Sequence, residues 1–336
     1  GGGIDRLEWR LLGDVGGDAV VDLSGMVDVA ALAVSGDWRL DLPEVAPVLS
    51  RLMPDLDNGV GGAVRGEGRF QGSPEDWSVD GALEGERIVV EGLTVDGAEL
   101  SFSASPDELS VERFEARLFD GYAAGSARLT PLAVSGAIEV DVEWHGIDTA
   151  GLPFSLAEAA EGSLDGALRV AGTVQRPETD LVLRWTGGTA SDLVRSGSLR
   201  ATLADGEVQL VSDGLDTAAG PLVVICSLPL GDLPLPEWLW SDAPSGPLEL
   251  TASGHSLNLG NVATALGRDP LPVETVSDVN LQVRWSPTDP GDRYGLLELE
   301  RVTLTHPGGV ITAPEGIRVQ LDRDVIVLER TRLVAP

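Results

Sequence analysis

Few residues of this 336-residue chain have the type and spacing that catalysis or metal binding requires. The three histidines, His145, His255 and His306, lie far apart, and the HxxxH, CxxC and HExxH spacings of metal sites are absent. We interpret each histidine as a polar surface residue. Ser155 and Ser256 lie in no nucleophile-elbow sequence. The sequence therefore predicts a non-enzymatic protein without a metal or a cofactor.

Two glycine-rich segments have compositions that occur in ion-binding loops. GDVGGDAVVDLSG, residues 13–25, is similar in composition to a calcium-binding repeat, but it occurs once and out of register. GGAVRGEG, residues 61–68, lacks both the GxGxxG spacing and the lysine of phosphate-binding loops. We expect a hairpin turn in the first segment and a strand in the second.

Composition narrows the possible partners. Apolar residues make up 43% of the chain, which is enough for a substantial apolar surface. The formal net charge is -31, and all 23 basic residues are arginine, so binding to nucleic acid is disfavoured. Cys226 is the only cysteine, which excludes an internal disulfide and predicts a small hydrophobic residue in a buried position. The run from Pro221 to Trp240 contains two acids and four prolines, and it is therefore no spanning helix.

Alternation of apolar and polar residues dominates the chain. In AIEVDVEW, residues 137–144, the apolar side chains point to one side and the acids to the other. LVLRW at 181–185, VNLQVRW at 279–285 and LLELE at 296–300 follow the same rule. Asp96–Gly97, Asp120–Gly121 and Asp205–Gly206 are typical of hairpin turns. We predict an all-β, mainly antiparallel fold with a few short helices.

Short helical patterns precede several predicted strands. They occur at residues 41–54, 152–162, 232–241 and 257–267. The strand after the first, residues 62–73, aligns without a gap on residues 162–173, after the second. Both copies keep glycine at Gly62/Gly162, Gly66/Gly166 and Gly72/Gly172, and 276–287 is a degenerate third copy. This repeat predicts one continuous stack of units, with approximate bounds 18–140, 141–230 and 231–336.

These helix–loop–strand phrases resemble the AsmA-like superfamily, and in particular its TamB-type members. The two long phrases at residues 40–85 and 151–185 carry the resemblance, together with strand runs such as residues 93–129. The resemblance implies an elongated, twisted β half-pipe with an apolar groove, in a periplasmic lipid-transfer protein anchored in the inner membrane. The chain would be a fragment of the repeat region of such a protein. Some TamB-type members work with an Omp85-type outer-membrane barrel protein, through parts that this chain does not include.

On this interpretation the groove binds phospholipid acyl chains by apolar burial alone. The expected lining residues are Val64, Phe70, Ile138, Val140, Val142, Trp144, Leu164, Leu168, Val170, Leu181, Leu183, Trp185, Val279, Leu281, Val283, Trp285, Leu297 and Leu299. We expect Gly66, Gly72, Gly166 and Gly172 to shape the groove by leaving room beside the backbone. The alternatives are a structural or adhesive β-solenoid or sandwich without lipid, an assembly factor for outer-membrane proteins, and a carbohydrate-active β-helix.

Overall fold

The computed structural model describes most of the chain and divides it into two compact units. The described residues are 6–16, 19–48, 60–90, 93–131, 135–151, 162–187, 194–232, 244–265, 269, 274–286, 288–289, 291–306, 309–323, 325–329 and 331–334. Unit 1 comprises Gly1–Phe154 and Ala167–Val174, and unit 2 comprises Ser155–Gly166 and Gln175–Pro336. The three approximate segments of the sequence repeat stay a prediction.

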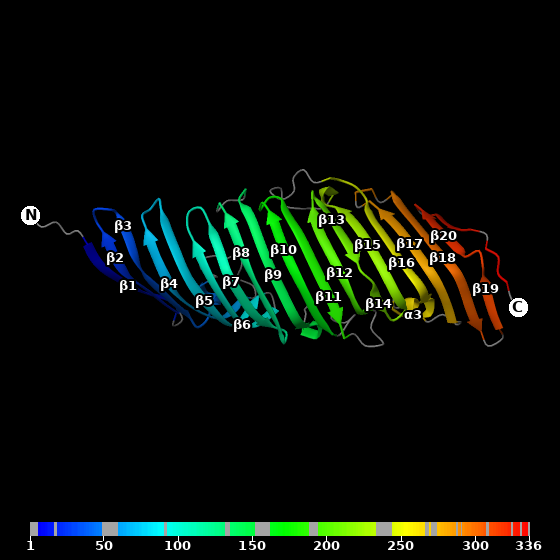
Figure 1. The fold of residues 1–336 in the computed structure, drawn as a ribbon, viewed down its shortest axis with the longest axis horizontal. Helices are drawn as coiled ribbons and strands as arrows, with labels where there is room; N and C mark the ends of the chain where they lie inside the picture. The colour runs from blue at the N-terminus through cyan, green and yellow to red at the C-terminus, as the bar shows by residue number, and fades with distance from the viewer. Residues whose placement is uncertain are drawn as a thin grey trace, which may run out of the picture. The chain divides into compact units, whose positions relative to one another are not determined.

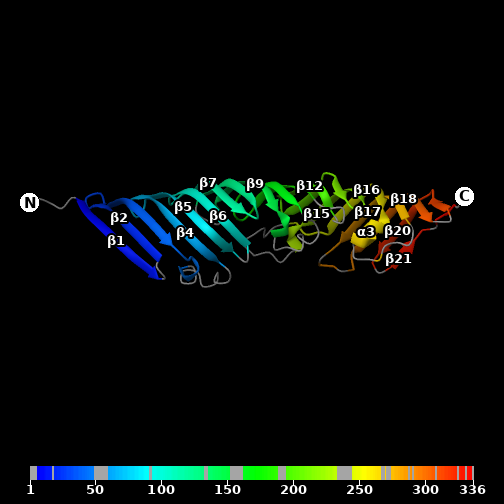
Figure 2. The same ribbon diagram turned by 90° about the horizontal axis from the view of Figure 1, so that it is seen from below.

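Unit 1 is an antiparallel sheet whose strands lie side by side in chain order (Figure 1). Its strands are β1 (Arg6–Gly16), β2 (Ala19–Asp28), β3 (Ala33–Leu42), β4 (Gly61–Gly72), β5 (Trp77–Val90), β6 (Leu93–Ala104), β7 (Leu109–Leu118), β8 (Gly121–Thr130) and β9 (Ala137–Asp148). The short helix η2 (Thr149–Gly151) follows β9, and β10 (Ser163–Gly172), whose residues from Ala167 on belong to unit 1, pairs with β9. Figure 2 shows the strands of this unit as one layer.

Unit 2 is built in the same way. Its strands are β11 (Pro177–Thr186), β12 (Val194–Ala204), β13 (Glu207–Ser212), β14 (Leu215–Thr217), β15 (Gly220–Pro229), β16 (Leu248–Asn258), β17 (Glu274–Trp285), β18 (Arg293–His306), β19 (Gly309–Ala313), β20 (Ile317–Asp322) and β21 (Val325–Leu328). The short helix η3 (Leu230–Asp232) follows β15, and α3 (Leu259–Ala265) packs against β16 and β17. All pairings with a defined register within the two units are antiparallel, which confirms the predicted fold class.

Most of the predicted local structure is confirmed. Residues 13–16 form the end of β1 and residues 19–25 the start of β2, and the two strands pair antiparallel, as expected of a hairpin. Hairpin turns also occur at Asp120–Gly121 and Asp205–Gly206. The turn predicted at Asp96–Gly97 is wrong, because both residues lie inside β6 at a register shift in its pairing with β7. An inserted residue in a strand leaves the same Asp-Gly signal as a hairpin turn.

The predicted short helices are described only in part. Helix α3 lies within the predicted segment 257–267, and residues 46–48 form a single helical turn. Residues 49–54, 152–161 and 233–241 lie outside the described residues. The turn at 46–48 is held at the start of β4, where the Val45 N–H donates to the Gly62 carbonyl (2.9 Å) and the Gly62 N–H donates to the Glu44 carboxylate (3.2 Å).

Two of the three glycine pairs shared by the repeat copies, Gly62/Gly162 and Gly72/Gly172, lie at the ends of β4 and β10. Gly62 and Gly72 have φ of 107° and 133°, and Gly162 and Gly172 have φ of 156° and 92°. Residues with a side chain rarely adopt these backbone angles, so glycine is required where each copy enters and leaves its strand. The backbone conformation therefore explains why both copies of the repeat keep glycine at the two ends of the strand.

Candidate functional site

Cross-strand register gathers apolar side chains on one face of unit 1. In an antiparallel pair, opposite residues point to the same side of the sheet. Trp38 of β3 lies opposite Leu23 of β2 and Gly68 of β4, and Phe70 lies opposite Gly36 and Val79. We call this side the apolar face of unit 1.

Aromatic rings lie on the glycines of this face. A Cβ added at Gly81 would be 2.2 Å from Cζ2 of Trp38, and one added at Gly66 would be 2.3 Å from Cδ2 of Leu83 and 3.0 Å from Cζ3 of Trp38. The Trp38 indole is also fixed by a hydrogen bond from its Nε1 to the Asp80 carbonyl (3.2 Å). The room that Gly66 leaves is therefore filled by side chains of the sheet itself.

Two aromatic pairs border a cavity on the apolar face. The ring centroids of Trp9 and Phe70 are 5.8 Å apart, and those of Trp38 and Phe102 are 6.0 Å apart. The cavity has a volume of about 830 Å³, which is within the usual range of small-molecule sites. Among the described residues no charged one lines it, and the described lining consists of Trp9, Leu23, Leu32, Val34, Trp38, Leu40, Phe70, Gln71, Gly72, Ser73, Pro74, Trp77, Ser78, Val79, Leu83 and Phe102.

Of the expected lining residues, only Phe70 borders this cavity, together with the expected shaping residue Gly72. Val64 lies on the same face, opposite Leu42 of β3. Farther along the sheet, Ile138, Val140, Val142 and Trp144 of β9 are half-buried, whereas the acids between them are exposed. They continue the apolar face through Leu129, Ala127, Gly125 and Ala123 of β8, which lie opposite them.

β10 shows the predicted alternation less clearly. Leu168 and Val170 are half-buried, Arg169 between them is exposed, and Gly172 is exposed. Leu164 and Gly166 belong to the part of the strand that clusters with unit 2, and all residues from 163 to 168 are half-buried. At the start of this strand the residues of both sides are therefore equally half-buried, and no side is more exposed than the other.

Unit 2 has an apolar face of its own, and the remaining predicted residues lie on it. Leu183 lies opposite Leu199, Val283 opposite Leu250 and Gly295, and Leu297 opposite Leu281 and Val319. The pairings of the other predicted residues follow the same register. These residues are Leu181, Trp185, Val279, Trp285 and Leu299. The side chains that lie opposite one another on this face, from β11 to β21, are mainly aliphatic. In unit 1, by contrast, aromatic rings lie among them.

Cys226 also lies on this face, opposite Leu210 and Leu250. It is half-buried rather than fully buried, and burial raises the pKa of its thiol. The thiol is therefore held neutral within an aliphatic surface that is only partly covered.

Little of the described apolar surface is fully covered. The fully buried hydrophobic residues among the described ones are Leu42, Ala116, Ala123, Ile147, Leu230, Leu257, Val302 and Ala313. Trp285, Ile326 and Leu328 of unit 2 remain 43%, 71% and 65% exposed. Closed domains of this length bury large side chains in a common core. In the described part of the chain, most large apolar residues instead lie on a sheet face that is open to solvent.

The opposite faces carry arginine–acid pairs between neighbouring strands. Arg10 and Asp22 form two hydrogen bonds, of 2.9 and 2.6 Å, and Arg200 and Asp180 form two of 2.8 and 2.6 Å. The hydrogen bonds from Arg10 hold the pKa of the Asp22 carboxyl below its ordinary value. These charged faces stay hydrated, so each unit has one dry and one wet side.

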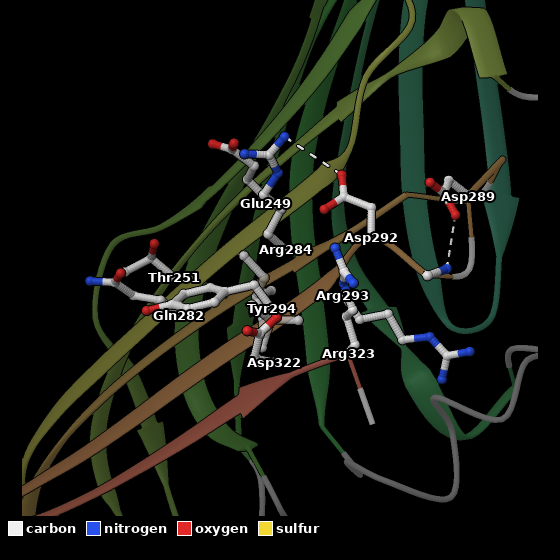
Figure 3. Close-up of a pocket in the computed structure, with 13 residues that line it drawn as sticks. Glu249, Thr251, Gln282, Arg284, Asp289, Asp292, Arg293, Tyr294, Asp322 and Arg323 are labelled. Carbon is white, nitrogen blue, oxygen red and sulfur yellow. Dashed lines mark hydrogen bonds and ion pairs between the residues drawn. The ribbon is translucent and has the colours of Figure 1, made fainter. Parts of the chain in front are cut away.

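A second large cavity lies on the wet side of unit 2, at the β17–β18 turn (Figure 3). It has a volume of about 870 Å³ and contains acids and arginines side by side. Arg284 pairs with Asp292 at 3.7 Å, and Glu249 lies beside Arg284 in the figure. Asp289 accepts a hydrogen bond from the Gly291 N–H (2.9 Å), which shapes the turn. The opposite charges neutralise one another in water-exposed positions, so this cavity offers no strong preference for a charged ligand.

Metal clusters and membrane-spanning helices are both absent from the described residues. No three histidine, cysteine, aspartate or glutamate side chains within them lie close enough together to hold a metal ion. None of the helices in the same residues has the length and apolar character needed to cross a bilayer.

Sequence reasoning missed the aromatic residues that dominate the cavity of unit 1. Trp9, Trp38, Trp77 and Phe102 each lie in an alternating strand, but their convergence depends on the register of six strands. The available signal was the pairing of large rings with glycines at matching positions of the next strand, such as Trp38 opposite Gly68. That pairing becomes visible only once the hairpin registers are known.

Fold and site together define two units of antiparallel β-sheet, each with one apolar and one charged face. Comparison with models of known families, with curated proteins and with solved structures finds no match for this chain.

Proposed function

We propose that this chain is a non-enzymatic lipid-binding segment of a lipid-transfer protein. The observation that carries the proposal is the cavity of about 830 Å³ in unit 1, whose described lining is mainly aromatic and aliphatic and contains no charged residue. The apolar face that each unit has over several strands supports the proposal. Acyl chains are held on such surfaces by burial, and covering about 200 Å² of hydrocarbon contributes about 5 kcal/mol.

The biological setting of the proposal follows from the resemblance to TamB-type AsmA-like proteins. The segment would lie in the periplasm of a Gram-negative bacterium, within a protein anchored in the inner membrane. It would shield phospholipid acyl chains between the inner and outer membranes and so contribute to outer-membrane biogenesis. An Omp85-type partner would be engaged by parts of the protein outside this chain.

The mechanism that the faces support needs no reactive group. An acyl chain would lie on the apolar face while its headgroup stayed in water at the edge of the sheet. Because neighbouring positions on the face offer similar apolar contacts, the free energy changes little as a chain moves between them. Lipid would then slide without an energy-coupling site in this segment.

Native mass spectrometry after incubation with phospholipid vesicles tests the proposal. The wild-type chain should retain phospholipid, and Val140→Arg should lower the bound amount about tenfold by placing a charge on the apolar face. Ser126→Arg is the matched control, because it adds the same charge on the exposed side of β8. A fluorophore sensitive to polarity, attached at Cys226, should shift its emission to the blue when lipid binds.

Two results would contradict the lipid proposal. A wild-type chain that retains no lipid would favour the structural or adhesive spacer. Equal loss of lipid in Val140→Arg and Ser126→Arg would mean that the face carrying Val140 does not hold the acyl chains.

A further inference from the structure

The turn between β2 and β3 differs from its neighbours at the same edge of unit 1. The turns after β2, β4 and β6 all lie along this edge (Figure 1). The second and third have the sequences Ser-Pro-Glu-Asp, residues 73–76, and Ser-Pro-Asp-Glu, residues 105–108. The first consists of Val29, Ala30, Ala31 and Leu32, and the apolar sequence continues to Val34. We call residues 29–32 the β2–β3 tip.

The β2–β3 tip exposes its apolar side chains to solvent. Leu32 is 73% exposed and Val29 is 43% exposed, and Ala30 and Ala31 are also exposed. The chain has a net charge of -31, and a charge this far from zero keeps a protein soluble and repels other negatively charged surfaces. The other two turns at this edge are acidic, so the tip is the place where the edge can approach another surface with little charge repulsion.

Leu32 also has a backbone conformation that disfavours leucine. Its φ is 50°, in the left-handed region where glycine, asparagine and aspartate are the common residues. Because Leu32 is 73% exposed and lies only at the border of the cavity, packing in the folded chain offsets little of this strain. An observed backbone outlier of this kind points to a role for the side chain itself.

Two backbone N–H groups of the tip find their acceptor within the turn. The Asp28 carboxylate accepts hydrogen bonds from the N–H groups of Ala30 (3.0 Å) and Ala31 (2.9 Å). A segment that enters a membrane interface must pair its polar backbone groups internally. The tip therefore presents an ordered, apolar protrusion with part of this requirement already met.

The tip lies at the border of the apolar cavity. Leu32 lines the cavity together with Val34, Trp9 and Trp77. Tryptophan prefers the boundary between headgroups and hydrocarbon, where its ring is amphipathic. The exposed tip and the cavity thus form one continuous apolar surface, which begins outside the sheet and leads onto its apolar face.

We propose that the β2–β3 tip inserts into the surface of a lipid bilayer and places the apolar cavity of unit 1 against it. Binding of the tip to a vesicle requires no lipid transfer. The inference therefore rests on the proposed function only for what happens to a lipid molecule after the tip has reached the bilayer.

Flotation of the full chain with phosphatidylcholine vesicles tests the inference. Leu32→Asn and Val29→Asn should each weaken vesicle binding about fivefold or more, because each removes an apolar side chain that becomes buried in the bilayer. Leu12→Asn is the matched control and should change binding by less than about twofold. Leu12 is 66% exposed but lies opposite Asp22, on the wet side and away from the tip.

Thermal melting distinguishes a membrane role from a structural one. Asparagine tolerates the left-handed backbone better than leucine does, so Leu32→Asn should melt at the same temperature as wild type or higher. A large drop in its melting temperature would show that Leu32 serves the fold and would overturn the inference.

Uptake of monomeric dihexanoylphosphatidylcholine separates this inference from the proposed groove. Val29 does not line the cavity, so Val29→Asn should take up the monomeric lipid as wild type does while binding vesicles weakly. Wild-type uptake without vesicle binding would overturn the tip and leave the groove intact. Tip-dependent vesicle binding without any uptake would uphold the tip and contradict the groove. A tip that joins two copies would show as a dimer lost in Val29→Asn, without vesicle binding, and would also overturn the inference.

Discussion

At the scale of single residues, the glycines of β4 and β5 allow an aromatic ring to pack directly on the backbone. Trp38 lies across Gly68 and Gly81 and keeps its indole N–H bonded to the Asp80 carbonyl. Glycine weakens a strand in isolation, but here it lets a large flat side chain contact the backbone of neighbouring strands. The ring restores the apolar contacts that the missing side chains would have made.

Gly81→Ala tests this packing. The added methyl group would lie 2.2 Å from Cζ2 of Trp38 and 2.7 Å from the Glu67 carbonyl oxygen, so the indole must leave its position. We expect the free energy of unfolding to fall by about 1–3 kcal/mol in a denaturant titration.

Gly97→Ala in β6 is the control for this substitution. A Cβ there would meet its nearest neighbour, Nη2 of Arg117, at 3.7 Å, which is ordinary contact. Its unfolding free energy should stay constant or rise by less than about 1 kcal/mol. Equal destabilisation of both variants would show that the Trp38 ring does not depend on Gly81.

At the scale of elements, β17 is fixed to both of its neighbours at a buried carboxylate. Asp278 is 10% exposed at its side chain, accepts a hydrogen bond from the Ser256 N–H (2.8 Å) and pairs with Arg301. Ser256 and Arg301 have φ of 53° and 51°, and both pairings of β17 shift register beside this point. One carboxylate therefore holds two irregularities in place, on β16 and on β18.

Asp278→Ala should destabilise unit 2 through both irregularities. It leaves the Ser256 N–H without its acceptor, and we expect a loss of about 1–3 kcal/mol in unfolding free energy. His255→Ala is the control, because the His255 side chain is 85% exposed and its Nδ1 is 3.7 Å from the same carboxylate. The control should change stability by less than about 0.5 kcal/mol. Similar losses in the two variants would contradict the structural role of Asp278.

The sequence predicted the elements better than their arrangement. Alternation in residues 137–144 was enough to assign β9 and its dry side, because a two-residue period is a local property. Asp96–Gly97 was misassigned because an inserted strand residue and a turn share one local signal. In β18 the alternation changes phase between Leu299 and Val302, and Arg301 marks the change with a positive φ.

The aromatic cavity was beyond local patterns. Trp9 meets Phe70 only because Gly25 and Gly36 lie between them on β2 and β3, in a register that three hairpins set jointly. Alternation identifies which residues share the side of a strand, but it does not say which strands bring them together.

At the scale of the whole molecule, charge is the dominant feature. A net charge of -31 produces self-repulsion in the folded chain, and the arginine–acid pairs offset it only locally. Raising sodium chloride from about 10 mM to about 150 mM shortens the screening length from about 30 Å to about 8 Å. We therefore expect the melting temperature to rise with salt in a calorimetric scan.

A variant with fewer acids tests the cause of this salt effect. Glu75→Gln, Asp107→Asn and Glu139→Gln, combined, remove three exposed negative charges. The combined variant should melt higher than wild type at low salt and respond less to added salt. A melting temperature that falls with salt would show that ion pairs outweigh the self-repulsion.

The pairing of each strand of unit 1 with only the strand before and the strand after it has a consequence for how such a chain changes over generations. Gain or loss of one hairpin leaves the registers of the remaining hairpins as they were. Each strand adds about 4.8 Å across the sheet, so one inserted hairpin lengthens the apolar face by about 10 Å. The length of the apolar face can then change by one hairpin at a time, while the pairing of the other strands stays the same.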